Sequence, residues 1–191
     1  MNSRNITIGL FGLPNILTLT RLAMTIPIVL VLLYTINSRV GTIMALFLIG
    51  IGGAIDKADG VIARKYNMET DFGKLLDPVV DKVWIHSIGI TLLHLGLLPF
   101  FYVVMTVARD LIITNLRESS TSSADFLKAA KLGKLKFRFQ VFTVIACLMH
   151  QFFLQSEYQF AAKYLYYCIL GIALYYTVAS LFFYLKRYLT A

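Results

Sequence analysis

The chain has 191 residues, of which 58% are hydrophobic and 15% charged, and its mean hydropathy is +0.73. A soluble domain is typically about half apolar and about a quarter charged, whereas here long stretches such as Val83–Val107 and Tyr158–Leu185 carry almost no charge. This pattern excludes a disordered tail protein, a disulfide scaffold and an ordinary soluble enzyme, and it predicts one integral membrane domain over residues 1–191. The net charge of +8 then indicates anionic lipid headgroups and phosphorylated substrates as partners, and no nucleic acid.

The N-terminal stretch Met1–Phe11 lacks the features of a signal peptide. It carries one basic residue, Arg4, and no small-residue cleavage site follows a short apolar core. A short interfacial amphipathic helix is the alternative, with Ile6, Leu10 and Phe11 in contact with lipid.

Six hydrophobic segments follow, and each is near the length of about 20 residues that a spanning helix needs. They are approximately Asn15–Tyr34, Gly41–Ala58, Asp77–Leu97, Pro99–Leu116, Leu135–Gln155 and Ala161–Leu185. The predicted fold class is therefore all-α, a polytopic membrane protein with six transmembrane helices.

The basic residues are unevenly distributed between the two ends of these segments. Of the 18 Lys and Arg residues, only Arg39 and Lys163 fall on the side of the first, third and fifth connections. The positive-inside rule then places both termini and the remaining loops in the cytoplasm. The longest polar stretch, Glu118–Lys136, is predicted to be a mobile cytoplasmic loop before the fifth segment.

The first segment opens with Pro14 and Asn15, which are helix-start residues. Arg21 follows less than two turns later. The alternative to a functional role for this stretch is a plain helix start, with the Arg21 side chain snorkelling to the membrane surface.

Four acids flank the connection between the second and third segments. Asp56 and Asp59 are three residues apart, and Asp77 and Asp81 are four apart, so each pair shares one helix face. If the two segments are neighbouring antiparallel helices joined by Arg64–Gly73, the four carboxylates meet as a box.

Such an all-oxygen, anionic site suits a hard cation such as Mg²⁺ or Mn²⁺, since zinc favours His or Cys ligands. Four negative charges require about two divalent ions for compensation, which indicates a two-metal site. The alternative for either pair alone is a helix end with solvated acids, or an ion pair with Lys57, Lys74 or Lys82.

The acids belong to a longer pattern of eight fixed residues over 26 positions, which reads Asp56-x-x-Asp59-Gly60-x-x-Ala63-Arg64-x8-Gly73-x-x-x-Asp77-x-x-x-Asp81. This pattern resembles, position by position, the signature of the CDP-alcohol phosphatidyltransferase family. The resemblance implies six transmembrane helices, a homodimer and an active site open to the cytoplasm. It also implies that Asp56 and Asp77 bridge two divalent ions, that Asp59 completes one and Asp81 the other, and that Asp81 is the catalytic base.

The same resemblance implies a set of residues that contact the CDP-activated lipid. Small residues let the backbone approach a nucleotide or another helix, and an arginine fork suits a pyrophosphate. The family commonly has P-N-x-x-T-x-x-R at the start of its first helix, which matches residues 14–21. The implied CDP-lipid residues are Asn15, Ile16, Leu17, Thr18, Gly60, Ala63, Arg64, Thr70 and Gly73.

A second basic cluster carries the prediction for the acceptor alcohol. Its two patterns are Arg109-Asp110…Leu116-Arg117 and Gly133-Lys134-Leu135-Lys136…Gln140. They resemble the glycerol-3-phosphate branch of the family, the phosphatidylglycerophosphate synthases. The resemblance implies an acceptor-phosphate pocket built from Arg109, Arg117, Lys134 and Lys136, although positive-inside topology and lipid attraction also explain any one of them.

The implied reaction joins CDP-diacylglycerol and sn-glycerol 3-phosphate to give phosphatidylglycerophosphate and CMP, and a bacterial inner membrane is the expected location. Within the family, inositol phosphate or phosphatidylglycerol is the alternative acceptor. A divalent-cation transporter is the alternative from another class, but its acids would be expected along a path through the bilayer. Here the acids cluster near one face.

Overall fold

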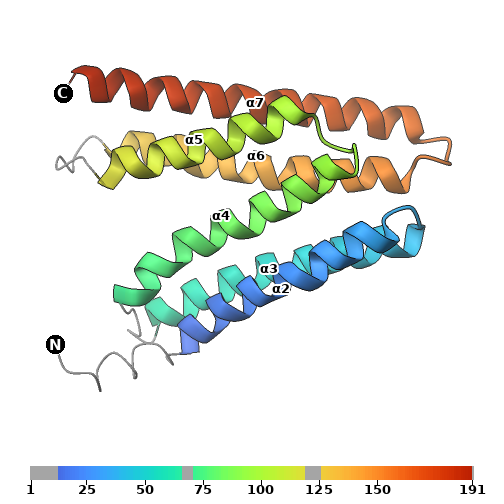
Figure 1. Ribbon diagram of the computed structural model, residues 1–191, viewed down its shortest axis with the longest axis horizontal. Helices are drawn as coiled ribbons and strands as arrows, with labels where there is room; N and C mark the ends of the chain where they lie inside the picture. Colours follow the sequence, from blue (N-terminus) through green and yellow to red (C-terminus); the bar gives the residue numbers. More distant parts are fainter. Residues whose placement is uncertain (1–12, 66–70, 119–125, 191) are drawn as a thin grey trace. The chain divides into compact units, whose positions relative to one another are not determined.

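The computed structural model describes residues 13–65, 71–118 and 126–190, and these residues form six α-helices and no strand (Figure 1). The helices are α2 (Leu13–Thr35), α3 (Arg39–Lys65), α4 (Asp71–His94), α5 (Phe100–Glu118), α6 (Phe126–Phe152) and α7 (Gln159–Thr190). The all-α prediction is confirmed for this part of the chain, and each helix overlaps one predicted segment. Met1–Phe11, the expected interfacial stretch, lies outside the described residues.

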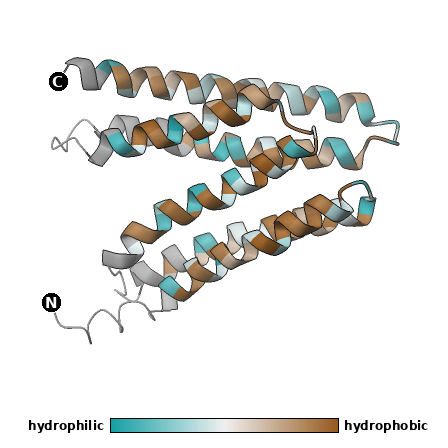
Figure 2. Ribbon diagram, viewed as in Figure 1, coloured by the Kyte–Doolittle hydropathy of each residue, from teal (hydrophilic) through white to brown (hydrophobic). Residues whose placement is uncertain are grey.

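Three segments of these helices are long and apolar enough to cross a membrane. They are Asn15–Thr35, Arg39–Ala58 and Gln159–Lys186. Hydrophobic residues dominate the ribbons of α2 and much of α3 (Figure 2), and large apolar side chains such as Ile26, Phe47 and Phe182 are more than half exposed. A surface of this kind is typical of a protein in contact with lipid.

The helices fall into two compact units, one ending at Thr91 and the other beginning at Leu92. In the first unit, α2 and α3 pack side by side. Ser38 caps α3, because its hydroxyl accepts the backbone N–H of Gly41 at 2.9 Å. Any side chain at Gly41 would collide with the carbonyl oxygen of Thr35, so the tight connection between the two helices requires glycine there.

The second unit begins with the turn that ends α4. Gly96 adopts a positive φ of 72°, its N–H bonds the Leu93 carbonyl, and the N–H of Leu97 bonds the Leu92 carbonyl. This is a Schellman cap, which closes the helix by satisfying its last carbonyls. After it, α7 packs against both α5 and α6, and the Tyr166 hydroxyl donates to the Leu97 carbonyl at 2.9 Å.

Two helix boundaries differ from the sequence prediction. The connection between the acidic pairs is shorter than Arg64–Gly73, because α3 continues to Lys65 and α4 begins at Asp71. The predicted loop Glu118–Lys136 is also too long, since α6 begins at Phe126. Residues 126–131 are mainly Leu, Ala and Lys, which are strong helix formers, so their helix propensity outweighs the polar character that suggested a loop.

Candidate functional site

The carboxylates of two helices converge on one arginine nitrogen in the first unit. Nη1 of Arg21, on α2, donates to Oδ1 of Asp56 on α3 and to Oδ1 of Asp81 on α4, the latter at 2.6 Å. The Arg21 side chain is only 3% exposed, whereas those of Asp56 and Asp81 are 40% and 37% exposed. The guanidinium therefore lies on the buried side of two carboxylates that remain accessible from outside.

A second contact between α2 and α4 lies one turn away. The Thr18 hydroxyl donates to Oδ1 of Asp77 at 2.8 Å. Thr18 precedes Arg21 by three residues, and Asp77 precedes Asp81 by four, so the two contacts follow each other in the same chain direction. The acidic face of α4 is thus aligned with the polar face at the start of α2.

An aromatic side chain supports the arginine from below. Trp84 is 2% exposed, and Cζ of Arg21 lies 5.2 Å from its ring centroid, within cation–π range. The indole fits against α3 because residue 52 is glycine, where an added Cβ would lie 3.1 Å from the ring. Among the described residues, neither Nε of Arg21 nor Nε1 of Trp84 has a hydrogen-bond partner, so ion pairing and ring stacking hold the guanidinium in place.

The chemistry of this cluster fits a hard-cation site. The atoms available in it as metal ligands are carboxylate oxygens. The Arg21 guanidinium contacts both Asp56 and Asp81, which shows that the fold brings these two carboxylates close together. The side chain of Asp59, the fourth predicted ligand, lies outside the described part of the chain. Among the side chains that the structure describes, no three His, Cys, Asp or Glu residues group as a metal-ligand set, so the four-carboxylate box stays a prediction.

The predicted CDP-lipid residues are placed in part. Asn15 and Thr18 are buried at the start of α2, Ile16 is exposed and Leu17 half-buried, and Gly73 is buried in the first turn of α4. Gly60, Ala63 and Arg64 belong to α3, but their side chains and all of Thr70 lie outside the described residues.

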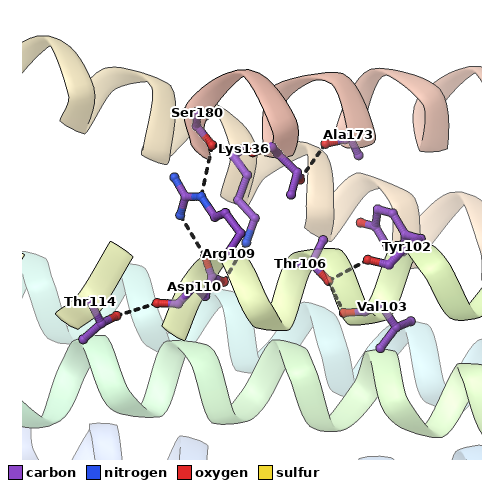
Figure 3. Close-up of polar contacts among 10 residues, drawn as sticks. Tyr102, Val103, Thr106, Arg109, Asp110, Thr114, Lys136, Ala173 and Ser180 are labelled. Carbon is purple, nitrogen blue, oxygen red and sulfur yellow. Dashed lines mark hydrogen bonds and ion pairs between the residues drawn. The ribbon is translucent and has the colours of Figure 1, made fainter. Parts of the chain in front are cut away.

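The predicted acceptor residues Arg109 and Lys136 meet in the second unit (Figure 3). Nη1 of Arg109 donates to Oδ1 of Asp110 at 2.8 Å, and Nζ of Lys136 donates to Oδ2 at 2.6 Å. Nε of Arg109 donates to the hydroxyl of Ser180 on α7 at 3.0 Å. All four side chains are buried, and the Asp110 carboxylate ion-pairs with a cation from α5 and a cation from α6.

Two polar atoms near these residues in the sequence have no hydrogen-bond partner in the described part of the chain. They are Nη2 of Arg109 and Oε1 of Gln140. Gln140 is buried and lies one helical turn after Lys136 on α6. Buried orphan donors and acceptors are costly in the absence of a ligand or water, so these atoms are candidates for contact with a polar ligand. The side chains of Arg117 and Lys134 lie outside the described residues.

Sequence reasoning missed three functional candidates. Snorkelling was the alternative considered for Arg21, whereas two carboxylates and an indole hold its side chain in the interior. Asp110 belongs to the pattern Arg109-Asp110…Leu116-Arg117, in which it was assigned no role. Its position next to Arg109 in the sequence could have indicated the ion pair between them. Ser180 has no local signal, since its partner is 71 residues away.

Comparison with known proteins identifies the family that the chain resembles. A family model described as CDP-alcohol phosphatidyltransferase matches residues 11–183. A protein of Bacillus subtilis named CDP-diacylglycerol–glycerol-3-phosphate 3-phosphatidyltransferase is 31% identical over 183 residues, which cover 90% of this chain and 92% of the relative. A protein of Rickettsia typhi with the same name is 35% identical over 133 residues, covering 70% and 74% of the two chains. A probable phosphatidylglycerophosphate synthase of Mycobacterium tuberculosis is 36% identical over 126 residues, covering 65% and 60%.

Proposed function

The chain belongs to the CDP-alcohol phosphatidyltransferase family, and from this premise we propose that it transfers the phosphatidyl group of CDP-diacylglycerol to sn-glycerol 3-phosphate. The products are phosphatidylglycerophosphate and CMP. Relatives from Bacillus and Rickettsia carry the name of this reaction. Within the molecule, the observation that carries the proposal is the convergence of Asp56 and Asp81 from two helices on one cation.

In the proposed reaction, the acceptor hydroxyl attacks the lipid-side phosphorus of the diphosphate. A new P–O bond forms, the bond to CMP breaks, and the hydroxyl proton passes to the Asp81 carboxylate as general base. When bound, two Mg²⁺ or Mn²⁺ ions would neutralise the charge that develops on the diphosphate and on CMP. Asp56, Asp59, Asp77 and Asp81 are the residues proposed to hold them.

The CDP-lipid is proposed to bind beside this cluster. Asn15 and Thr18 begin the helix that also carries Arg21, and Gly73 is buried one turn before Asp77. A nucleotide diphosphate needs close backbone approach and fixed donors, and in this proposal Gly73 allows the approach and Asn15 is a donor. Gly60, Ala63, Arg64 and Thr70 complete the proposed binding set.

A phosphorylated acceptor is favoured over a neutral alcohol by the buried cations of the second unit. Arg109 and Lys136 share one carboxylate, Asp110, and Nη2 of Arg109 remains without a partner among the described residues. A phosphate would accept a charge-assisted hydrogen bond from Nη2 of Arg109, which is stronger than the bond that a neutral hydroxyl would accept. Arg117 and Lys134 are proposed as further phosphate contacts.

The proposed setting is the inner membrane of a bacterium, with the active site facing the cytoplasm. Six spans are proposed, because α4, α5 and α6 are each close to or longer than the roughly 20 residues that a bilayer crossing requires. The uneven distribution of Lys and Arg supports the orientation. Assembly as a homodimer among membrane lipids follows from the family resemblance.

The test is the release of CMP from CDP-diacylglycerol by purified protein in detergent. Release is expected only when glycerol 3-phosphate and Mg²⁺ or Mn²⁺ are both present, and chelation by EDTA should abolish it reversibly. Inositol phosphate, serine and phosphatidylglycerol are offered one at a time as competing acceptors. Faster release with any of these than with glycerol 3-phosphate would reassign the acceptor, and metal uptake by proteoliposomes without CMP release would favour a transporter.

A further inference from the structure

Arg21 lies in the acidic cluster but has no role in the proposed reaction. Arg21 bonds both Asp56 and Asp81 through the same nitrogen, yet it is neither a metal ligand nor a proton acceptor. Fixed charge at a metal site has one of two effects. It competes with the ion for the carboxylates, or it holds the carboxylates in the orientation that the ion needs.

The burial pattern distinguishes these effects. The arginine side chain is 3% exposed beneath carboxylates that are 37% to 40% exposed. Ions arriving from solvent therefore meet the carboxylates first. The Trp84 ring lies 5.2 Å from Cζ of Arg21 and packs closely against Gly52. The ring therefore restricts movement of the guanidinium away from the carboxylates on that side.

The charge balance points the same way. Without Arg21, Asp56 and Asp81 would bring two like charges together from different helices, and they would lose the one ion pair that each makes with a described residue. Both carboxylates accept from the same nitrogen, Nη1, and the rigid guanidinium plane fixes where that nitrogen lies. Among the described residues, each acid bonds Arg21 through Oδ1 alone, and Oδ2 is the oxygen proposed to face an ion.

We propose that Arg21 is a positioning residue of the metal site, which orients Asp56 and Asp81 from their buried side and thereby raises the affinity of the cluster for divalent ions. The inference rests on the proposed function, because it takes the acidic cluster to be a metal site. It adds a residue on α2 that acts on the ligands of α3 and α4 without touching the ions.

The experiment uses the full chain in detergent and Mn²⁺ as the probe. Trp84 is the single tryptophan of the chain and lies directly beneath the cluster, so its fluorescence reports on the site during a Mn²⁺ titration. The paramagnetic resonance signal of free Mn²⁺ gives the bound fraction independently. Arg21→Gln should raise the Mn²⁺ concentration at half-saturation about 10- to 100-fold, the usual effect of losing a group that orients metal ligands.

Two further variants separate positioning from general structure. Arg21→Lys keeps the charge but lacks the planar fork, and we expect it to recover part of the lost affinity. Arg39→Gln removes an exposed arginine at the other end of α3 and should leave the half-saturation point unchanged.

Other outcomes overturn the inference. An unchanged half-saturation point in Arg21→Gln, even with a lower melting temperature, would make Arg21 a purely structural residue. A lower half-saturation point would show that the guanidinium competes with the ion. If the wild-type chain binds no Mn²⁺, the metal part of the proposed function fails as well, so the two failures are distinguishable.

Discussion

The hydroxyl of Thr18 donates to the carboxylate of Asp77 at 2.8 Å, although the two residues are 59 positions apart in the chain. Other threonine hydroxyls of α2, those of Thr20 and Thr35, bond carbonyls one turn earlier in their own helix. Such internal bonds satisfy a hydroxyl in an apolar setting without a partner helix. Thr18 therefore ties the start of α2 to a predicted metal ligand on α4.

Thr18→Val should lower kcat/KM for CDP-diacylglycerol about 10- to 150-fold, because a hydrogen bond to a charged group contributes about 1.5–3 kcal/mol. The measurement is the initial rate of CMP release at varied CDP-diacylglycerol. Thr20→Val is the matched control on the same helix, and its rate should stay near wild type. Equal effects of the two substitutions would mean that the contact with Asp77 has no part in the reaction.

Asp81→Asn should reduce CMP release at least about a hundredfold, since an amide cannot accept the hydroxyl proton as a general base. Asparagine keeps the shape of the side chain, so the melting temperature serves as the check on folding. Glu157→Gln, which changes an exposed acid in the connection before α7, should leave the rate unchanged. Substantial turnover by Asp81→Asn would remove this residue from the role of base.

Asp110→Asn should raise the KM for glycerol 3-phosphate while leaving the KM for CDP-diacylglycerol near its wild-type value. The carboxylate bonds both Arg109 and Lys136, so its neutralisation releases two cations from their fixed positions. Breaking a buried pair by removing one partner typically costs about 3–5 kcal/mol, and a fall in melting temperature is therefore expected too.

The separation of the two KM values is the decisive readout, because a general loss of stability would affect both substrates alike. Ser180→Ala removes one bond to Arg109 and should change the acceptor KM in the same direction, but less. Thr177→Val is its control on α7, since the Thr177 hydroxyl bonds the carbonyl of Ala173 in its own helix. A raised KM for CDP-diacylglycerol alone would assign the cluster to the nucleotide.

Two neighbouring glycines of α3 provide a test of the support beneath Arg21. Gly52→Ala places a methyl group 3.1 Å from the Trp84 ring, whereas Gly53→Ala meets nothing within 4 Å. Both substitutions gain up to about 1 kcal/mol of helix propensity, but only the first must displace the indole. We expect a shifted Trp84 emission spectrum and slower CMP release for Gly52→Ala, and neither change for Gly53→Ala.

Melting temperatures of the two variants complete this comparison. Gly53→Ala should melt at or above the wild-type temperature, and Gly52→Ala below Gly53→Ala. Identical spectra and rates for the two variants would show that the ring accommodates the methyl group without disturbing the cluster.

Much of this protein follows from the sequence alone, because the relevant signals are local. Apolar runs of about 20 residues define the helices, and the spacing of Asp77 and Asp81 places both on one helix face. The same local pattern carried the family resemblance. The ends of the helices follow less directly from the sequence, as the start of α6 at Phe126 shows. Helix propensity favours a helix there, whereas the polar composition favours a loop.

Only the tertiary structure decided which side chains meet. Arg21 has a helix-start sequence around it and no local partner, and its ion pairs depend on how α2 is rotated toward α3 and α4. The bond from Arg109 to Ser180 likewise depends on the packing of α5 against α7. Periodicity fixes the face of a helix on which a residue lies, whereas its partner is set by the packing of side chains from distant segments.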